Sequence, residues 1–169
     1  MYAIHLTAMT YKEFARNFKL KTEALLYHEQ IDLAVSVCKR LYSDYQKFTI
    51  KYNWGNPDLL LATIGFIEEF KTTDIDSIPV REKISQIEEN TPDTEVFGDS
   101  SYALNACVAI CETLDFLIDH KGEHIYNVGI CLTDTIDFKI QENASLKQPE
   151  IDNNKEMIAA RTFLLGLNL

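Results

Sequence analysis

TPDTEVF (residues 91–97) and TDTIDF (residues 133–138) mark the stretch of the chain that decides the fold. Around these blocks, apolar residues recur at steps of three and four in two sets: Ala103, Ala106, Ile110, Leu114 and Leu117, then Ile125, Val128, Leu132, Ile136 and Ile140. That spacing lines one face of an α-helix. The stretch therefore predicts two consecutive helices, over about 99–120 and up to about 141. Lys121-Gly122 predicts the end of the first.

The same periodicity predicts five more helices outside this stretch. The clearest, from about Lys21 to Phe48, carries a continuous apolar stripe that includes Ile31, Ala34, Cys38 and Leu41. Thr10 and Glu13 fit a capping box that starts a short helix to about residue 18. The others are expected at about 56–70, 79–90 and 149–165, and Gly65 would allow a close helix crossing. Alternating strand patterns are essentially absent. We expect an all-α, compact single-domain bundle of about six or seven helices over residues 1–169.

The composition supports a packed core and an acidic surface. Of the 169 residues, 46% are hydrophobic, including nine Phe and eight Tyr. A domain of this size buries roughly 70% of its unfolded surface. Lys and Arg number 16 against 26 Asp and Glu, which gives a formal net charge of −10. This charge repels phosphate backbones, so nucleic-acid binding is not expected, whereas a basic protein partner is compatible with it.

Location and redox state also have sequence signals. The chain shows neither a basic leader followed by an apolar run nor an uninterrupted apolar segment near 18 residues, so secretion and membrane spanning are not expected. Cys38, Cys107, Cys111 and Cys131 lie in helical patterns beside apolar residues, and we expect reduced, buried thiols in a cytoplasmic protein. Cys107 and Cys111 stand one turn apart, but no second Cys or His pair at zinc spacing accompanies them.

Carboxylate spacing gives the sharpest candidate site. Glu112 and Asp115 are three residues apart, as are Asp134 and Asp137, on two consecutive helices. Because residues three apart share a helix face, antiparallel packing would bring four oxygen donors together for Mg²⁺ or Mn²⁺. The alternative is that both pairs only solvate the surface, since they point away from the apolar stripes. We favour the solvated surface and assign no catalytic or cofactor-binding residue.

Other motifs are weaker. His28, His120 and His124 are isolated in the sequence, and there is no Gly-rich phosphate loop and no nucleophile elbow. Tyr52 and Trp54 are expected to close one end of the core, although aromatic residues at a helix junction would also suit a partner. In the TPDTEVF loop, Val96 and Phe97 are expected to enter the core.

Several blocks, in order, resemble the YjaG-like family of uncharacterised bacterial proteins. They are QIDLA (30–34), CKRL (38–41), YQKF (45–48), GNPDLL (55–60), TPDTEVF (91–97), YA (102–103), ETL (112–114) and TDTIDF (133–138) with Gln141. The resemblance covers about Lys21 to Gln141. The chain departs from the family at 42–44, where the family helix contains a proline, and near 148–150. The resemblance implies a compact all-helical domain and a bacterial source. It implies no catalytic residue, cofactor or substrate, because the family's function is unknown.

Two classes of function fit the sequence. The first is a non-enzymatic, acidic helical domain that binds another protein, with immunity and antitoxin proteins as one version. The second is a hydrolase of a phosphorylated small molecule, in which the carboxylates bind a divalent metal: Glu112, Asp115, Asp134 and Asp137. The net charge and the missing catalytic set favour the first. Carboxylates that converge in a cleft would favour the second.

Overall fold

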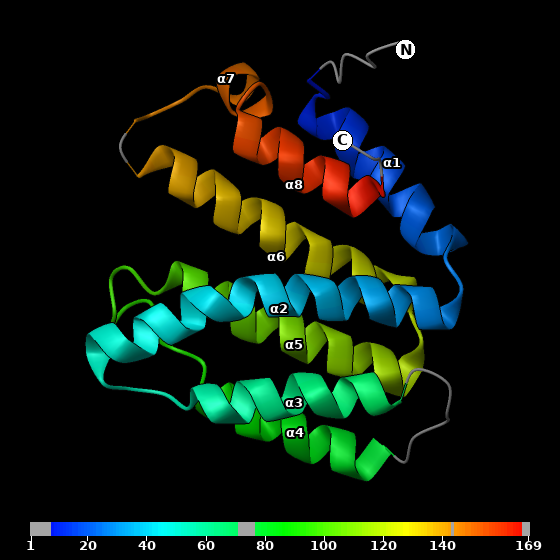
Figure 1. Ribbon diagram of the computed structural model, residues 1–169, viewed down its shortest axis with the longest axis vertical. Coiled ribbons are helices and arrows are strands. Elements are labelled where there is room, and N and C mark those ends of the chain that lie inside the picture. Colours follow the sequence, from blue (N-terminus) through cyan, green and yellow to red (C-terminus); the bar gives the residue numbers. More distant parts are fainter. Residues whose placement is uncertain (1–7, 71–76, 143, 167–169) are drawn as a thin grey trace.

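A computed structural model describes residues 8–70, 77–142 and 144–166, and in these ranges all regular structure is helical. Figure 1 shows the eight helices of the described residues: α1 (Tyr11–Ala24), α2 (Tyr27–Tyr52), α3 (Pro57–Glu69), α4 (Ser77–Glu89), α5 (Ser101–Asp119), α6 (Gly122–Gln141), α7 (Gln148–Asp152) and α8 (Lys155–Leu165). The predicted all-α single domain is confirmed, with eight helices described where six or seven were expected.

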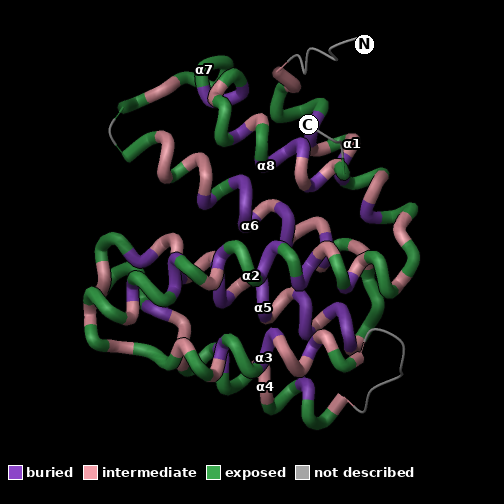
Figure 2. Tube along the Cα trace, viewed as in Figure 1, coloured by how far each residue is buried: buried purple, intermediate pink, exposed green. Residues whose placement is uncertain are grey.

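Helix α5 lies at the centre of the bundle. It packs against α6, α2, α4 and α3, and α6 packs in turn against α1 and α8. In Figure 1, α3 and α4 lie on one side of this central group, and α1, α7 and α8 lie on the other. Buried positions recur along α2, α5 and α6 in Figure 2, so these three helices form the middle of the core.

The central position of α5 explains why its sequence is so apolar. Among the described helices, α5 alone is long and apolar enough to cross a membrane by length and composition. The core helix of a globular domain has the same properties, and α5 buries residues along its whole length, from Ala103 to Leu117. Its contacts with four other helices account for its apolar sequence.

The boundary between α1 and α2 differs from the prediction. The helix predicted from Lys21 to Phe48 is wrong at its start, because Lys21–Ala24 completes α1. The next two residues are extended, and the Leu26 amide donates to the Glu29 carboxylate at 2.8 Å, just before α2 begins. The predicted stripe along α2 is confirmed, since its four named members are buried: Ile31, Ala34, Cys38 and Leu41.

The turn between α5 and α6 also differs. His120 adopts a left-handed conformation (φ 57°) and ends α5, Lys121 is extended, and Gly122 is the first residue of α6. The predicted end of the helix near His120 is confirmed, but the prediction that Gly122 is its C-terminal glycine is wrong. A non-glycine residue takes the left-handed position here, and Gly122 lies in the first turn of the next helix.

The C-terminal helix of the prediction, 149–165, is divided in two. Asn153-Asn154 interrupts it, and the Asn154 side chain accepts a hydrogen bond from the Glu156 amide at 2.8 Å. This contact starts α8 afresh, because a side-chain acceptor satisfies an amide that the first turn leaves without a partner.

Aromatic residues close the end of α2, as predicted for Tyr52 and Trp54. The ring of Phe97, from the connection before α5, lies 5.2 Å from that of Phe48, 5.0 Å from Tyr52 and 5.4 Å from Trp54. The prediction for Val96 is wrong, because its side chain is 69% exposed. The TPDTEVF loop therefore adds Phe97 to the core without its neighbour.

A glycine allows a close helix crossing at Gly129 on α6, and not at Gly65 on α3 as predicted. Around Gly65, no atom lies within 4 Å of the place that a Cβ would take, so the predicted close crossing there is wrong. At Gly129 on α6, the ring of Phe18 on α1 fills that place. The missing side chain at residue 129 lets α1 and α6 approach closely.

Candidate functional site

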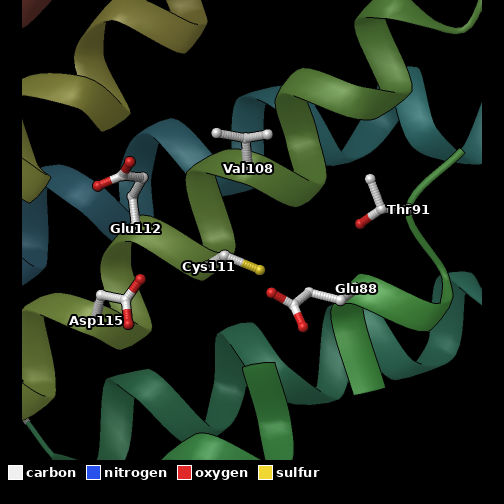
Figure 3. A pocket seen from close by; sticks show the side chains of 6 residues that line it. All are labelled: Glu88, Thr91, Val108, Cys111, Glu112 and Asp115. Atoms are coloured by element: carbon white, nitrogen blue, oxygen red, sulfur yellow. The ribbon is translucent and has the colours of Figure 1, made fainter. Parts of the chain in front are cut away.

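A hollow of about 320 Å³ lies between α4 and α5 (Figure 3). Six residues from α4, α5 and the connection between them line it: Glu88, Thr91, Val108, Cys111, Glu112 and Asp115. In Figure 3, the Glu88 carboxylate points across from α4 towards the Cys111 thiol on α5. We call this site the acidic groove, because half of its lining residues carry a carboxylate.

Val108 and Cys111 supply the apolar part of the acidic groove. Burial, together with the nearby Cys107, Glu88 and Asp115, raises the pKa of the Cys111 thiol to about 12. The thiol therefore stays protonated at neutral pH. Since the thiolate is the nucleophilic form of cysteine, Cys111 is a packing residue and not a reactive one.

Glu88 and Asp115 are the carboxylates of the groove that a ligand can reach. Within the described part of the chain, neither side-chain carboxylate makes a hydrogen bond or an ion pair, although the charges of Arg81 and His124 act on Asp115. Partial burial is the main cause that raises the pKa of Asp115. The charges of His124 and Arg81 oppose this rise, and the charge of Glu112 adds to it. A further cation beside Asp115 would favour its ionised form and offset the cost of its lost hydration.

Glu112, by contrast, has partners for both of its oxygens. Its Oε2 lies 2.6 Å from His124 Nδ1, and its Oε1 accepts a hydrogen bond from Asn127 Nδ2 at 3.2 Å. His124 Nε2 lies 3.2 Å from Asp119 Oδ1. Sequence reasoning missed this cluster and treated His124 as isolated. The short turn predicted between the two helices could have indicated this cluster, because such a turn folds the end of α5 back beside the start of α6.

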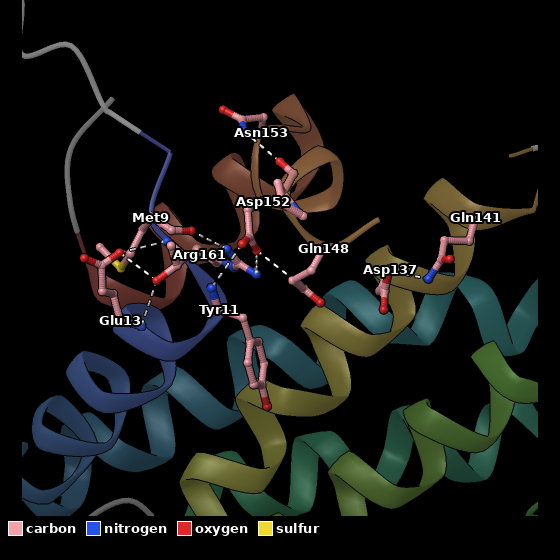
Figure 4. Close-up of polar contacts among 11 residues, drawn as sticks. Met9, Tyr11, Glu13, Asp137, Gln141, Gln148, Asp152, Asn153 and Arg161 are labelled. Carbon is pink, nitrogen blue, oxygen red and sulfur yellow. Dashed lines mark hydrogen bonds and ion pairs between the residues drawn. The ribbon is translucent and has the colours of Figure 1, made fainter. Parts of the chain in front are cut away.

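The second carboxylate pair lies on α6. Asp134 is exposed, and Asp137 accepts a hydrogen bond from Gln141 Nε2 at 2.8 Å (Figure 4). Partial desolvation, together with the charge of Asp137, raises the pKa of Asp134. In the described ranges, no three His, Cys, Asp or Glu side chains are grouped so that they would hold a metal ion. The four residues of the metal-site alternative are thus not grouped in the described structure: Glu112, Asp115, Asp134 and Asp137.

A buried ion pair fastens the C-terminal helices to α1 (Figure 4). Arg161 is 4% exposed, and its Nη2 donates to Asp152 Oδ1 at 2.8 Å. Its Nη1 donates to the Met9 carbonyl at 2.6 Å. Asp152 also accepts bonds from Gln148 Nε2 at 2.9 Å and from the Tyr11 amide at 3.4 Å. The pair therefore ties the segment around Met9 and Tyr11 to the C-terminal helices.

Two other hollows have linings of mixed charge. One, of about 460 Å³ between α1 and α6, is lined in part by Lys19, Glu23 and Glu123. The other, of about 130 Å³ beside the end of α2, contains the buried Asp44, which Lys139 Nζ contacts at 2.7 and 2.8 Å. Because both hollows contain a cation beside their carboxylates, they offer less to a positively charged ligand than the acidic groove does.

Comparison with known proteins identifies the family. The sequence model of a family described as "Protein of unknown function (DUF416)" matches residues 17–165. The solved structure of a DUF416 family protein from Shewanella baltica has a similar fold, with a TM-score of 0.76 and 21% sequence identity over 90% of this chain and 82% of that one. At this identity the likeness concerns the fold alone. No curated protein matches the chain. The YjaG-like resemblance is confirmed, and the chain belongs to the DUF416 family of uncharacterised proteins.

Proposed function

We propose that this protein is a non-enzymatic binding domain that takes a basic segment of another protein into the acidic groove. The observation that carries the proposal is the pair Glu88 and Asp115, two carboxylates that make no hydrogen bond or ion pair among the described residues and that line the groove together with the apolar Val108 and Cys111. Immunity and antitoxin proteins, which bind basic toxins, are one class of protein that this proposal includes. A cytoplasmic location is part of the same proposal.

The chemistry of the groove suits a lysine or arginine side chain. The aliphatic stem of such a residue would lie against Val108 and Cys111, while its charged end would meet the carboxylates. The net charge of −10 would attract a basic partner from a distance and raise its association rate. Both effects favour a cationic peptide over a neutral or acidic one.

An arginine-rich peptide tests the proposal as a probe of the groove. We expect the double variant Glu88→Gln/Asp115→Asn to weaken binding of a hexa-arginine peptide about fivefold. This follows because exposed ion pairs contribute roughly 0.2–1 kcal/mol each and 1.4 kcal/mol corresponds to about tenfold in affinity. Isothermal titration calorimetry at low ionic strength measures the change.

A matched control separates the groove from the overall charge. Glu69→Gln/Glu82→Gln removes the same two charges from exposed positions on α3 and α4 that do not line the groove. We expect less than about a twofold change, because only the long-range attraction falls. Equal losses in the two double variants would contradict binding at the groove. Affinity purification with the native protein and both variants, followed by mass spectrometry, would then identify a partner whose recovery depends on Glu88 and Asp115.

A further inference from the structure

Helix α6 begins without a cap from its own first residues. The Lys121 side chain makes no capping hydrogen bond, and the first helical residue is a glycine. The carboxylate of Asp119, the last residue of α5, takes over this role. Its Oδ1 accepts a hydrogen bond from the Lys121 amide at 3.0 Å, and its Oδ2 lies 2.8 Å from Lys121 Nζ. The geometry of the turn therefore depends on where the Asp119 side chain is held.

His124 holds Asp119 in place and joins it to Glu112. Both of its ring nitrogens face carboxylates: Nδ1 lies 2.6 Å from Glu112 Oε2, and Nε2 lies 3.2 Å from Asp119 Oδ1. A neutral imidazole carries one N–H and donates once, whereas the imidazolium carries two and donates to both acceptors. In the neutral form, one lone pair would face a carboxylate oxygen. The geometry fits the protonated ring.

We propose that His124 is a pH-sensitive lock on the α5–α6 turn, in which the imidazolium bridges Glu112 and Asp119 and its deprotonation frees one carboxylate and loosens the turn. The proposal does not depend on the acidic groove binding a partner. Because Glu112 also lines the groove, the lock would act on the shape and charge of one wall of that site.

The surroundings of His124 favour its charged form. Glu112 and Asp119 of α5 contact its ring, and the charge of Asp115, also on α5, acts on it. Glu123 is its neighbour in the chain. The cations around this cluster are Lys121, which pairs with Asp119, and Arg81 of α4, whose charge acts on Asp115. Carboxylates outnumber cations in this set. The ring of the other nearby histidine, His120, packs against Tyr27 and Phe116 instead.

The pKa of His124 has the direction that this lock needs. Partial burial by itself lowers the pKa, but the hydrogen bonds and negative charges of Glu112 and Asp119 outweigh it and raise the pKa above its ordinary value of 6.5. A group whose pKa is higher in the folded state stabilises that state fully below its unfolded pKa. The stabilisation is lost as the pH rises through the folded pKa, so the turn loosens above that value.

Two measurements on the full chain test the lock. Nitrogen NMR of the histidine rings should give a titration midpoint for His124 above 6.5, and Asp119→Asn should lower it. Amide hydrogen exchange, corrected for intrinsic rates, should show protection of the Lys121 and His124 amides falling about two- to fivefold as the pH passes that midpoint. In His124→Gln, which donates from a neutral amide, protection should not depend on this titration.

His28→Gln is the matched control. His28 is exposed on α2 and has no hydrogen bond or ion pair in the described residues, so its removal should leave both readouts unchanged. A midpoint for His124 at or below 6.5 would overturn the proposal. So would the same pH-dependent loss of protection in His124→Gln. If His124→Gln does not fold, the titration midpoint of His124 in the Asp119→Asn variant still tests the proposal, because it is measured on a variant that retains His124.

Discussion

At the scale of single residues, Gly65 and Gly129 both lie inside helices but have opposite surroundings. We expect Gly129→Ala to lower the free energy of unfolding by about 1–3 kcal/mol, because its Cβ would meet the buried ring of Phe18. We expect Gly65→Ala to raise it by about 0.5–1 kcal/mol, because alanine favours a helix and no atom lies within 4 Å of its Cβ. Urea denaturation followed by circular dichroism measures both.

The two variants serve as controls for each other, since both replace a helical glycine by alanine. If both stabilised the protein, helix propensity would dominate, and the crossing of α1 and α6 would not need the missing side chain. If both destabilised it, Gly65 would have a packing role that the structure does not show.

Single residues were also the hardest to place from the sequence. The helix crossing glycine was predicted at residue 65 and lies at 129, because a crossing point depends on which helices meet and not on local composition. The surroundings of Val96 and His124 were also predicted wrongly, because they too depend on contacts made in the folded chain. Hydrophobicity alone does not tell which of Val96 and Phe97 turns inward, and the partners of His124 come from α5, across a turn.

At the scale of elements, the carboxylates of α5 and α6 predict the response to divalent metals. We expect Mg²⁺ or Mn²⁺ not to raise the melting temperature above that in NaCl of matched ionic strength. Glu112 is occupied by His124 and Asn127, and Asp137 is bonded to Gln141. Asp134→Asn should behave as the unaltered protein does. Differential scanning fluorimetry measures the melting temperature.

A metal site would give a clear contrary signal. Binding at a hundredfold excess over Kd would stabilise the fold by about 2.7 kcal/mol. For a domain of this size that raises the melting temperature by on the order of 5–10 °C. A Mn²⁺-dependent rise of this size, lost in Asp134→Asn, would favour the hydrolase hypothesis over protein binding. Matched ionic strength is essential, because any salt screens the repulsion of an acidic protein.

The sequence predicted which segments form helices better than where they end. The apolar stripe of α2 was placed correctly, since burial needs one continuous face over many residues. The breaks at Leu25-Leu26 and Asn153-Asn154 were missed or misplaced. They depend on side-chain caps worth about 1 kcal/mol each, and the residues that make such caps also occur inside helices.

At the scale of the whole molecule, Arg161 joins parts of the chain that lie far apart in the sequence. It contacts the Met9 carbonyl, 152 residues away, and Asp152. We expect Arg161→Met to cost about 3–5 kcal/mol of unfolding free energy, because it leaves the Asp152 carboxylate buried without a cation. Adding Asp152→Asn should recover part of the loss, because the stranded charge is removed. Urea denaturation at pH 7 measures each variant.

Lys39→Met is the matched control for this pair. Lys39 contacts Glu68 at 2.7 Å, but the two side chains are 52% and 36% exposed, and breaking such a pair should cost less than about 1 kcal/mol. If Lys39→Met were as costly as Arg161→Met, burial would not decide the strength of these pairs. If Asp152→Asn worsened Arg161→Met, hydrogen bonds to the Asp152 carboxylate would matter more than its charge.

The overall class of the fold was predictable, but its layout was not. Helical periodicity over most of the chain and the lack of strand patterns predict an all-α domain. The central place of α5 depends on contacts between distant segments. The acidic groove depends on α4 lying beside α5, and the sequence therefore pointed to Glu112 and Asp115 but not to Glu88.

The aromatic closure at the end of α2 has a practical consequence for spectroscopy. Trp54 is the single tryptophan of the chain, and its ring lies against those of Phe48 and Phe97. Intrinsic fluorescence excited at the indole band therefore reports on one place, where the connection before α5 docks on α2. A red shift of the emission would signal that this end has become hydrated, even if the helical content were unchanged. The protein thus carries its own probe of local opening, without a label.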